Sequence, residues 1–123
     1  MKLEIKRVII FTHRMEEMAA FYREQMGLRE IPDPQYDRDE WQEFDAGSAR
    51  IALHRAYGKK SGTKSATHGC AHKIVFYAKN VAAARTALLK KKVEMGELKK
   101  FGSLQLCDGT DPDGNKIQIS NRR

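Results

Sequence analysis

The feature that most constrains this chain is an internal repeat that spans nearly all of its 123 residues. Each half has the pattern of a strand, a helix and then three short strands, so the order βαβββ occurs twice. The two copies are in register, because Arg7 precedes Arg14 by the same seven residues that separate Lys73 from Asn80. We therefore predict an α+β fold of two pseudo-symmetric βαβββ modules, forming a curved eight-stranded mixed sheet with the helices on the outside.

The first module is predicted to hold one helix between strands rich in β-branched and aromatic residues. The predicted elements are a strand over 3–11, a helix over 14–26, and strands over 28–31, 41–45 and 49–54. Gly27 is placed to cap the C-terminus of the helix. Residues 46–48, Ala-Gly-Ser, form the turn of a hairpin between the last two strands.

The second module repeats this order after a segment without periodicity. Its predicted elements are a strand over 72–78, a helix over 81–92, short strands near 93–98 and 103–108, and a last strand over 116–120. Asn80 is a natural N-cap for the helix. We predict a single domain over 1–123, in which module one covers 1–56, a flexible linker covers 57–69 and module two covers 70–123.

Length and composition fit one small globular domain in the cytoplasm. No apolar run approaches the ~20 residues that cross a membrane, and the N-terminus lacks the apolar stretch of a signal peptide. The two cysteines, Cys70 and Cys107, do not make a disulfide framework. A reduced compartment is the default expectation, and a single bridge between them is the less favoured alternative.

The net charge of +7 raises the question of a polyanionic partner. The basic residues are spread along the chain, apart from short lysine runs at 59–60, 90–92 and 99–100. No nucleic-acid-binding motif accompanies them. The charge therefore favours a solvated surface over a nucleic-acid footprint, and we expect neither nucleic acid nor a membrane as a partner.

Two short motifs in this frame point to a family. Phe21-Tyr22 is followed by Met26-Gly27-Leu28, and Asp-Pro-Asp-Gly-Asn at 111–115 turns the chain into the last strand. With the paired βαβββ modules, these motifs resemble the vicinal-oxygen-chelate superfamily, which includes glyoxalase I, extradiol dioxygenases, fosfomycin-modifying enzymes and bleomycin-binding proteins. The resemblance covers nearly the whole chain and implies the family's curved sheet around a ligand cleft.

Metal-dependent members of that family bind a divalent ion with side chains from the first and last strands of each module. The resemblance places the first-strand positions on Arg7 and Lys73, and the last-strand positions on Ala52 and Gln118. Two cations, a methyl group and a neutral amide do not form a site for a divalent cation. We therefore predict no metal and no cofactor; displaced ligands at His54 and His72 are the alternative.

The alternation of side chains indicates what the cleft contains instead. The family register turns Arg7, Phe11, Lys73 and Tyr77 toward the cleft. Arg50 and Lys116 would add positive charge there, but because both lie near strand starts we favour the alternative that their side chains extend to water. Such a pocket suits a planar or apolar ligand that bears a carboxylate, a phosphate or a phenolate. The predicted ligand-binding residues are Arg7, Phe11, Trp41, Glu43, His54, Lys73, Tyr77 and Gln118. Glu43 is also a candidate general base, although no catalytic partner for it is identified.

Three functions compete at this level. The favoured one is a small-molecule-binding protein without a metal, which takes an anionic or aromatic metabolite. The second is a lyase, isomerase or dioxygenase that uses displaced metal ligands, and the third is a regulatory or nucleic-acid-associated module. Because one copy of the architecture leaves sheet edges and an open cleft, we also predict a homodimer.

Overall fold

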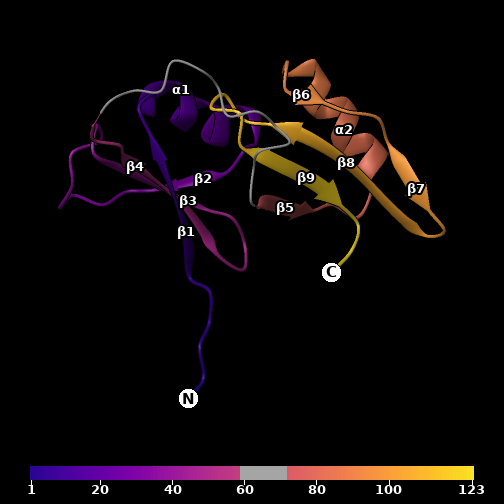
Figure 1. Ribbon diagram of the computed structural model, residues 1–123, viewed down its shortest axis with the longest axis horizontal. Helices are drawn as coiled ribbons and strands as arrows, with labels where there is room; N and C mark the ends of the chain where they lie inside the picture. Colours follow the sequence, from indigo (N-terminus) through magenta and orange to yellow (C-terminus); the bar gives the residue numbers. More distant parts are fainter. Residues whose placement is uncertain (59–71) are drawn as a thin grey trace. The chain divides into compact units, whose positions relative to one another are not determined.

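A computed structural model describes residues 1–58 and 72–123 of the chain (Figure 1). The chain divides into two compact units, Met1–Gly62 and Thr63–Arg123, and each has its own sheet. Most of the predicted linker over 57–69, and with it Cys70, lies outside the described residues. No helix in the described parts of the chain is long and apolar enough to cross a membrane.

The sheet of the first unit is mixed and has four strands. These are β1 (Arg7–Thr12), β2 (Arg29–Ile31), β3 (Trp41–Asp45) and β4 (Arg50–Arg55), in the spatial order β1-β4-β3-β2. β1 runs parallel to β4, and the other pairs are antiparallel. β1 begins at Arg7 rather than at residue 3; the last contact before it is the hydrogen bond that the backbone N–H of Arg50, the first residue of β4, donates to the backbone oxygen of Lys6 at 2.9 Å. The first six residues extend away from β1 (Figure 1).

The helical segment of this unit changes its winding halfway. The predicted helix over 14–26 is present as α1 (Met15–Ala20), which continues directly into the π-helix η1 (Phe21–Gln25). The wider π turn alters the angular spacing of side chains, and the neighbours Phe21 and Tyr22 are both buried here. Gly27 follows with φ +73°, as expected of a C-terminal cap.

The second unit repeats this plan with one addition. Its elements are β5 (Lys73–Tyr77), α2 (Val81–Lys90), β6 (Glu94–Met95), β7 (Lys99–Phe101), β8 (Leu104–Thr110) and β9 (Lys116–Ser120). The spatial order is β5-β9-β8-β6, and β7 also pairs with β8. The side chain of Asn80 accepts a hydrogen bond from the backbone N–H of Ala83 at 3.0 Å, which confirms the predicted N-cap.

The predicted α+β fold of two βαβββ modules is confirmed, with two differences in detail. The strands form a four-stranded and a five-stranded mixed sheet, one in each unit. The described residues contain nine strands rather than eight, because the edge of the second sheet is divided into β6 and β7. β7 was not predicted; it pairs with β8 through the tight turn at Gly102, whose φ is +61°.

The register of the repeat is the same in both units. Arg7 pairs with Arg50 across β1 and β4, and Lys73 pairs with Lys116 across β5 and β9. Two residues further along, Ala52 and Gln118 occupy corresponding positions on β4 and β9. The sequence alignment of the two modules is therefore right, and His72 lies just before the strand rather than within it.

Each sheet has a packed face and an open face. In the first unit Phe44, Ile51 and Leu53 are buried together with Met18 and Tyr22 of the helical segment. The packed face of the second sheet likewise buries Cys107, Ile117 and Ile119, together with Val81 and Leu88 of α2. The alternation along each strand leaves the opposite side chains on the open face.

We predict that Gly109→Ala destabilises the second unit. A Cβ at this position would lie 2.5 Å from the backbone oxygen of Glu94 and would overlap the sulfur of Met95. Overpacking of this kind costs about 1–3 kcal/mol of unfolding free energy. Urea denaturation of the parent protein and of the Gly109→Ala variant measures this difference in unfolding free energy.

Gly96→Ala is the matched control. Its added Cβ meets only the backbone oxygen of Asp108, at an ordinary distance of 3.4 Å. The stability of this variant should stay close to that of the parent. Equal losses in the two variants would contradict the close packing of β6 against β8.

Candidate functional site

The open face of the first sheet is organised in three rows that run across the strands. Strand pairing places charged residues in the first row, mainly apolar residues around one carboxylate in the second, and rings in the third. The rows are Arg7, Arg50, Asp45 and Arg29; then Ile9, Ala52, Glu43 and Ile31; then Phe11, His54 and Trp41.

A buried carboxylate joins two of the three arginines of the first row, Arg7 and Arg50. Glu43 Oε2 accepts hydrogen bonds from Arg50 Nη1 at 2.7 Å and from Arg7 Nη2 at 3.3 Å. The Glu43 side chain is only 6% exposed, whereas those of Arg7 and Arg50 are 41% and 46% exposed. The carboxylate is therefore shielded from solvent, and the guanidinium groups are accessible.

The environment of Glu43 keeps it ionised. Burial acts to raise its pKa, but the hydrogen bonds from Arg50 and Arg7, together with their positive charges, outweigh burial and lower the pKa of Glu43 below its ordinary value. A carboxylate with a lowered pKa is a weak proton acceptor at neutral pH. This geometry favours a role for Glu43 in holding the two arginines over a role as general base.

The third row consists of aromatic rings in tilted and edge-on contacts. The ring centroid of His54 lies 5.1 Å from that of Phe11 and 5.9 Å from that of Trp41, and the ring of Tyr36 lies 5.8 Å from Trp41. His54 Nδ1 lies 2.8 Å from the backbone oxygen of Arg55. The indole nitrogen of Trp41 is buried and has no hydrogen-bond acceptor among the described residues.

The open face of the second sheet carries a comparable ion pair. Asp108 Oδ1 accepts hydrogen bonds from Lys73 Nζ and from Gln118 Nε2, both at 2.9 Å. Burial acts to raise the pKa of Asp108, but the contacts with Gln118 and Lys73 lower it overall. Next to this group, the guanidinium of Arg123 lies 4.7 Å above the ring of Tyr77.

The predicted ligand-binding residues fall on the open faces of the two units. Those of the first unit are Arg7, Phe11, Trp41, Glu43 and His54; those of the second are Lys73, Tyr77 and Gln118. The sequence analysis missed three residues of these faces: Asp108, the aromatic ring of Tyr36 and the guanidinium group of Arg123. The repeat itself could have identified Asp108, because it follows Lys73 by 35 residues and Glu43 follows Arg7 by 36.

These side chains do not fit the divalent ion of metal-dependent relatives. The four corresponding positions hold Arg7, Ala52, Lys73 and Gln118, and the two nearby carboxylates are each bound to a cation. Within residues 1–58 and 72–123, no three His, Cys, Asp or Glu side chains are grouped so that they could hold a metal ion. The donor chemistry of both open faces is that of ion pairs rather than of a metal site.

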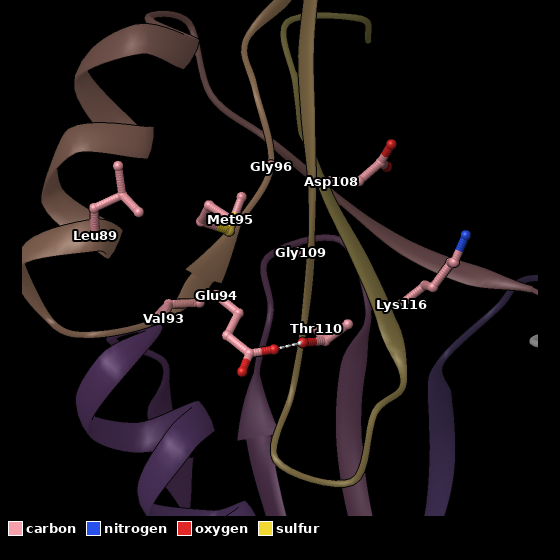
Figure 2. A pocket seen from close by; sticks show the side chains of 9 residues that line it. All are labelled: Leu89, Val93, Glu94, Met95, Gly96, Asp108, Gly109, Thr110 and Lys116. Carbon is pink, nitrogen blue, oxygen red and sulfur yellow. Dashed lines mark hydrogen bonds between the residues drawn. The ribbon is translucent and has the colours of Figure 1, made fainter. Parts of the chain in front are cut away.

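A hollow of about 480 Å³ lies at the β6 edge of the second sheet (Figure 2). Its lining comprises Leu89, Val93, Glu94, Met95, Gly96, Asp108, Gly109, Thr110 and Lys116. Figure 2 shows the side chains of Asp108 and Lys116 on the side of β8 away from Leu89 and Met95. None of the eight predicted ligand-binding residues lines this hollow, so it does not extend the candidate site.

Comparison with known protein families gives a match over most of the chain. The model of the Glyoxalase/Bleomycin resistance protein/Dioxygenase superfamily matches residues 4–119. A search of the curated proteins finds no match.

Several solved structures share the fold at low sequence identity. A glyoxalase family protein from Bacillus anthracis is 21% identical, with a TM-score of 0.78 over 100% of this chain and 98% of its own. TnmS3, an antibiotic binding protein from Streptomyces sp. CB03234, is 17% identical, with a TM-score of 0.74 over 96% and 94%. Lactoylglutathione lyase from Agrobacterium tumefaciens is 17% identical, with a TM-score of 0.69 over 94% and 91%. At these identities the likeness establishes the fold.

We predict that Glu43→Gln destabilises the protein at neutral pH and makes it less sensitive to acid. Because the folded-state pKa of Glu43 is lowered, its ion pairs stabilise the fold above the unfolded-state pKa and are lost as the pH falls through the folded-state value. The expected loss is about 1–2 kcal/mol at neutral pH, and it should shrink below the ordinary glutamate pKa of 4.5. Urea denaturation at several pH values measures both effects.

Glu17→Gln serves as the control for loss of a carboxylate. The Glu17 side chain is 62% exposed and pairs with Arg14 on the helix surface, so its removal should change stability little at any pH. A Glu43→Gln deficit that stays constant through the acid range would contradict the assignment of the acid sensitivity to Glu43.

Proposed function

Because the chain belongs to the Glyoxalase/Bleomycin resistance protein/Dioxygenase superfamily, we propose that it binds a small anionic or aromatic metabolite on its open sheet faces without a metal ion. The repeated ion pair carries this proposal. At the first-strand position where metal-dependent members have a ligand, Arg7 is bound to Glu43 and Lys73 to Asp108.

The chemistry of the open faces supports an anionic ligand with a flat apolar part. Accessible guanidinium groups match the geometry of a carboxylate or phosphate and form charge-assisted hydrogen bonds. Exposed apolar side chains, Ile9 and Phe11 in the first unit and Val75 and Tyr77 in the second, lie on the same faces as the cations. TnmS3 is named as an antibiotic binding protein, which is in keeping with small-molecule binding on this fold.

The alternative, an enzyme with displaced metal ligands, has less support in the geometry. His54 lies between the rings of Phe11 and Trp41, and its Nδ1 faces a backbone carbonyl. His72 is exposed and lies just before β5. The match to lactoylglutathione lyase concerns the fold, and it transfers no catalytic residue to this chain.

We predict that protein purified without chelator contains no stoichiometric divalent metal, because both carboxylates near the family's ligand positions are held by cations. Its thermal transition should be unchanged by a chelator and should rise with anionic aromatic compounds, since a ligand that binds only the folded state stabilises it. Elemental analysis and thermal-shift measurements test both points. The matched neutral amides are the controls. A chelator-sensitive transition, or equal shifts with acids and amides, would contradict the proposal.

We further propose that the protein is a homodimer. Leu3 and Ile5 are exposed along the segment that precedes β1, and β1 is an edge strand of its sheet, which is a kind of edge that another chain commonly covers. Sedimentation at micromolar concentration should give twice the chain mass of 14.1 kDa. A species of single-chain mass throughout this range would count against the dimer.

A further inference from the structure

We propose that the open face of the first unit is a head-to-tail site for an elongated aromatic anion. The carboxylate of the ligand lies at Arg7 and Arg50, and an aromatic ring that carries a hydrogen-bond acceptor lies at Phe11, His54 and Trp41. This inference rests on the proposed function and names the class of its ligand.

The length of the ligand follows from the spacing of the rows. Arg7 and Phe11 are four residues apart on β1, and Arg50 and His54 are four apart on β4. At ~3.3 Å per residue, the backbone positions of the two rows are about 13 Å apart. The guanidinium groups of Arg7 and Arg50 contact Glu43, which belongs to the row between them, so a ligand that contacts both ends spans at most this distance. In that middle row Ile9 is 43% exposed and provides an apolar surface, whereas Ala52 is fully buried.

Arg7 and Arg50 can still bind an anion although both contact the carboxylate of Glu43. Both arginines donate to the same oxygen of Glu43, and each guanidinium has five N–H donors, of which one is used in this contact. The neighbouring Arg29 and Asp45 neutralise each other at 3.0 Å, so the group of Arg7, Arg50 and Glu43 keeps one net positive charge. Because the carboxylate is shielded and the guanidinium groups are accessible, an anion arriving from solvent meets the positive groups first.

The aromatic end offers both a stacking surface and an unsatisfied donor. Phe11 is 64% exposed, and its ring lies next to that of His54. The indole N–H of Trp41 is buried without an acceptor among the described residues, which is costly for a polar group. Trp41 and Tyr36 also line a recess of about 20 Å³, room for one water-sized group. A hydroxyl or carbonyl oxygen on the ligand ring would satisfy this donor.

The charge of the first unit argues that the occupant is small. The first unit, Met1–Gly62, contains eleven Asp and Glu and eleven Lys and Arg, so it has no net positive charge although the whole chain is basic. A long polyanion would meet these carboxylates around the face and be repelled. A small organic anion contacts only the local positive group, and it complements the aromatic row as well.

The experiment uses the full chain and the fluorescence of Trp41, its only tryptophan. The probe is hydroxybiphenyl carboxylate, a rigid molecule with the carboxylate and the hydroxyl at opposite ends. Two analogues separate the contacts: the carboxamide lacks the charge, and biphenyl carboxylate lacks the hydroxyl. The probe should quench Trp41 saturably, and the carboxamide should bind about tenfold more weakly because it loses the charge-assisted hydrogen bonds.

Two substitutions assign the ends of the ligand. Arg7→Gln should weaken the carboxylate probe about tenfold and leave the carboxamide unchanged, whereas Arg23→Gln, the same change away from the open face, should affect neither. Trp41→Phe, followed by calorimetry, should remove the preference for the hydroxylated probe over biphenyl carboxylate. Thermal unfolding of each variant, with Arg7→Lys as a charge-retaining form, separates lost binding from lost folding.

The outcomes distinguish this inference from the proposed function. Anion-selective binding that depends more on Lys73→Gln than on Arg7→Gln would overturn the placement on the first unit and leave the proposed function standing. The same holds if Trp41→Phe keeps the preference for the hydroxyl. Fluorescence that changes with protein concentration and not with probe would mean that a second copy covers this face, and it would also overturn the inference. Equal binding of acid and amide would count against the proposed function itself.

Discussion

The architecture of the open faces depends on one interaction, the ion pair between a carboxylate on the next-to-last strand of the unit and a cation on its first strand. It occurs in each unit, as Glu43 with Arg7 and as Asp108 with Lys73. A sheet that packs one face on a helix must leave its other face in contact with something polar or with a ligand. The ion pair fixes the cations on that face, and in the first unit it also draws in Arg50. The positions of the exposed apolar and aromatic side chains are then defined relative to this fixed charge.

This interaction also accounts for the basic side chains on the open faces of the two sheets. A divalent ion would attract carboxylates toward the open face, and a cationic side chain with a carboxylate partner gives a similar attraction without the ion. In the first unit the pair is shielded on the carboxylate side and accessible on the guanidinium side. That asymmetry leaves the guanidinium groups accessible to the anionic ligand that we propose.

The sequence predicts what depends on local pattern and on the repeat. The strand register, the Asn80 cap and the Gly27 cap follow from spacing and from residue type, and all three agree with the structure. The contacts that define the site join residues about 35 positions apart, and their partners depend on which strands become neighbours. From the sequence, Arg7 and Lys73 are expected to face an anionic ligand, and in the structure they are paired with Glu43 and Asp108. The π turn and β7 escaped prediction because tertiary packing, not propensity, determines them.

The two modules share a plan but differ in chemistry, and this difference bears on the basic charge of the whole chain. The first module holds arginines and a row of rings on its open face, and its residues 1–58 carry a slight excess of acids. Residues 72–123 hold eleven Lys and Arg against five Asp and Glu. The high isoelectric point thus originates outside residues 1–58. Two modules of the same fold can carry surfaces of different chemistry. The net charge of the whole chain is then a poor guide to the ligand that one module binds.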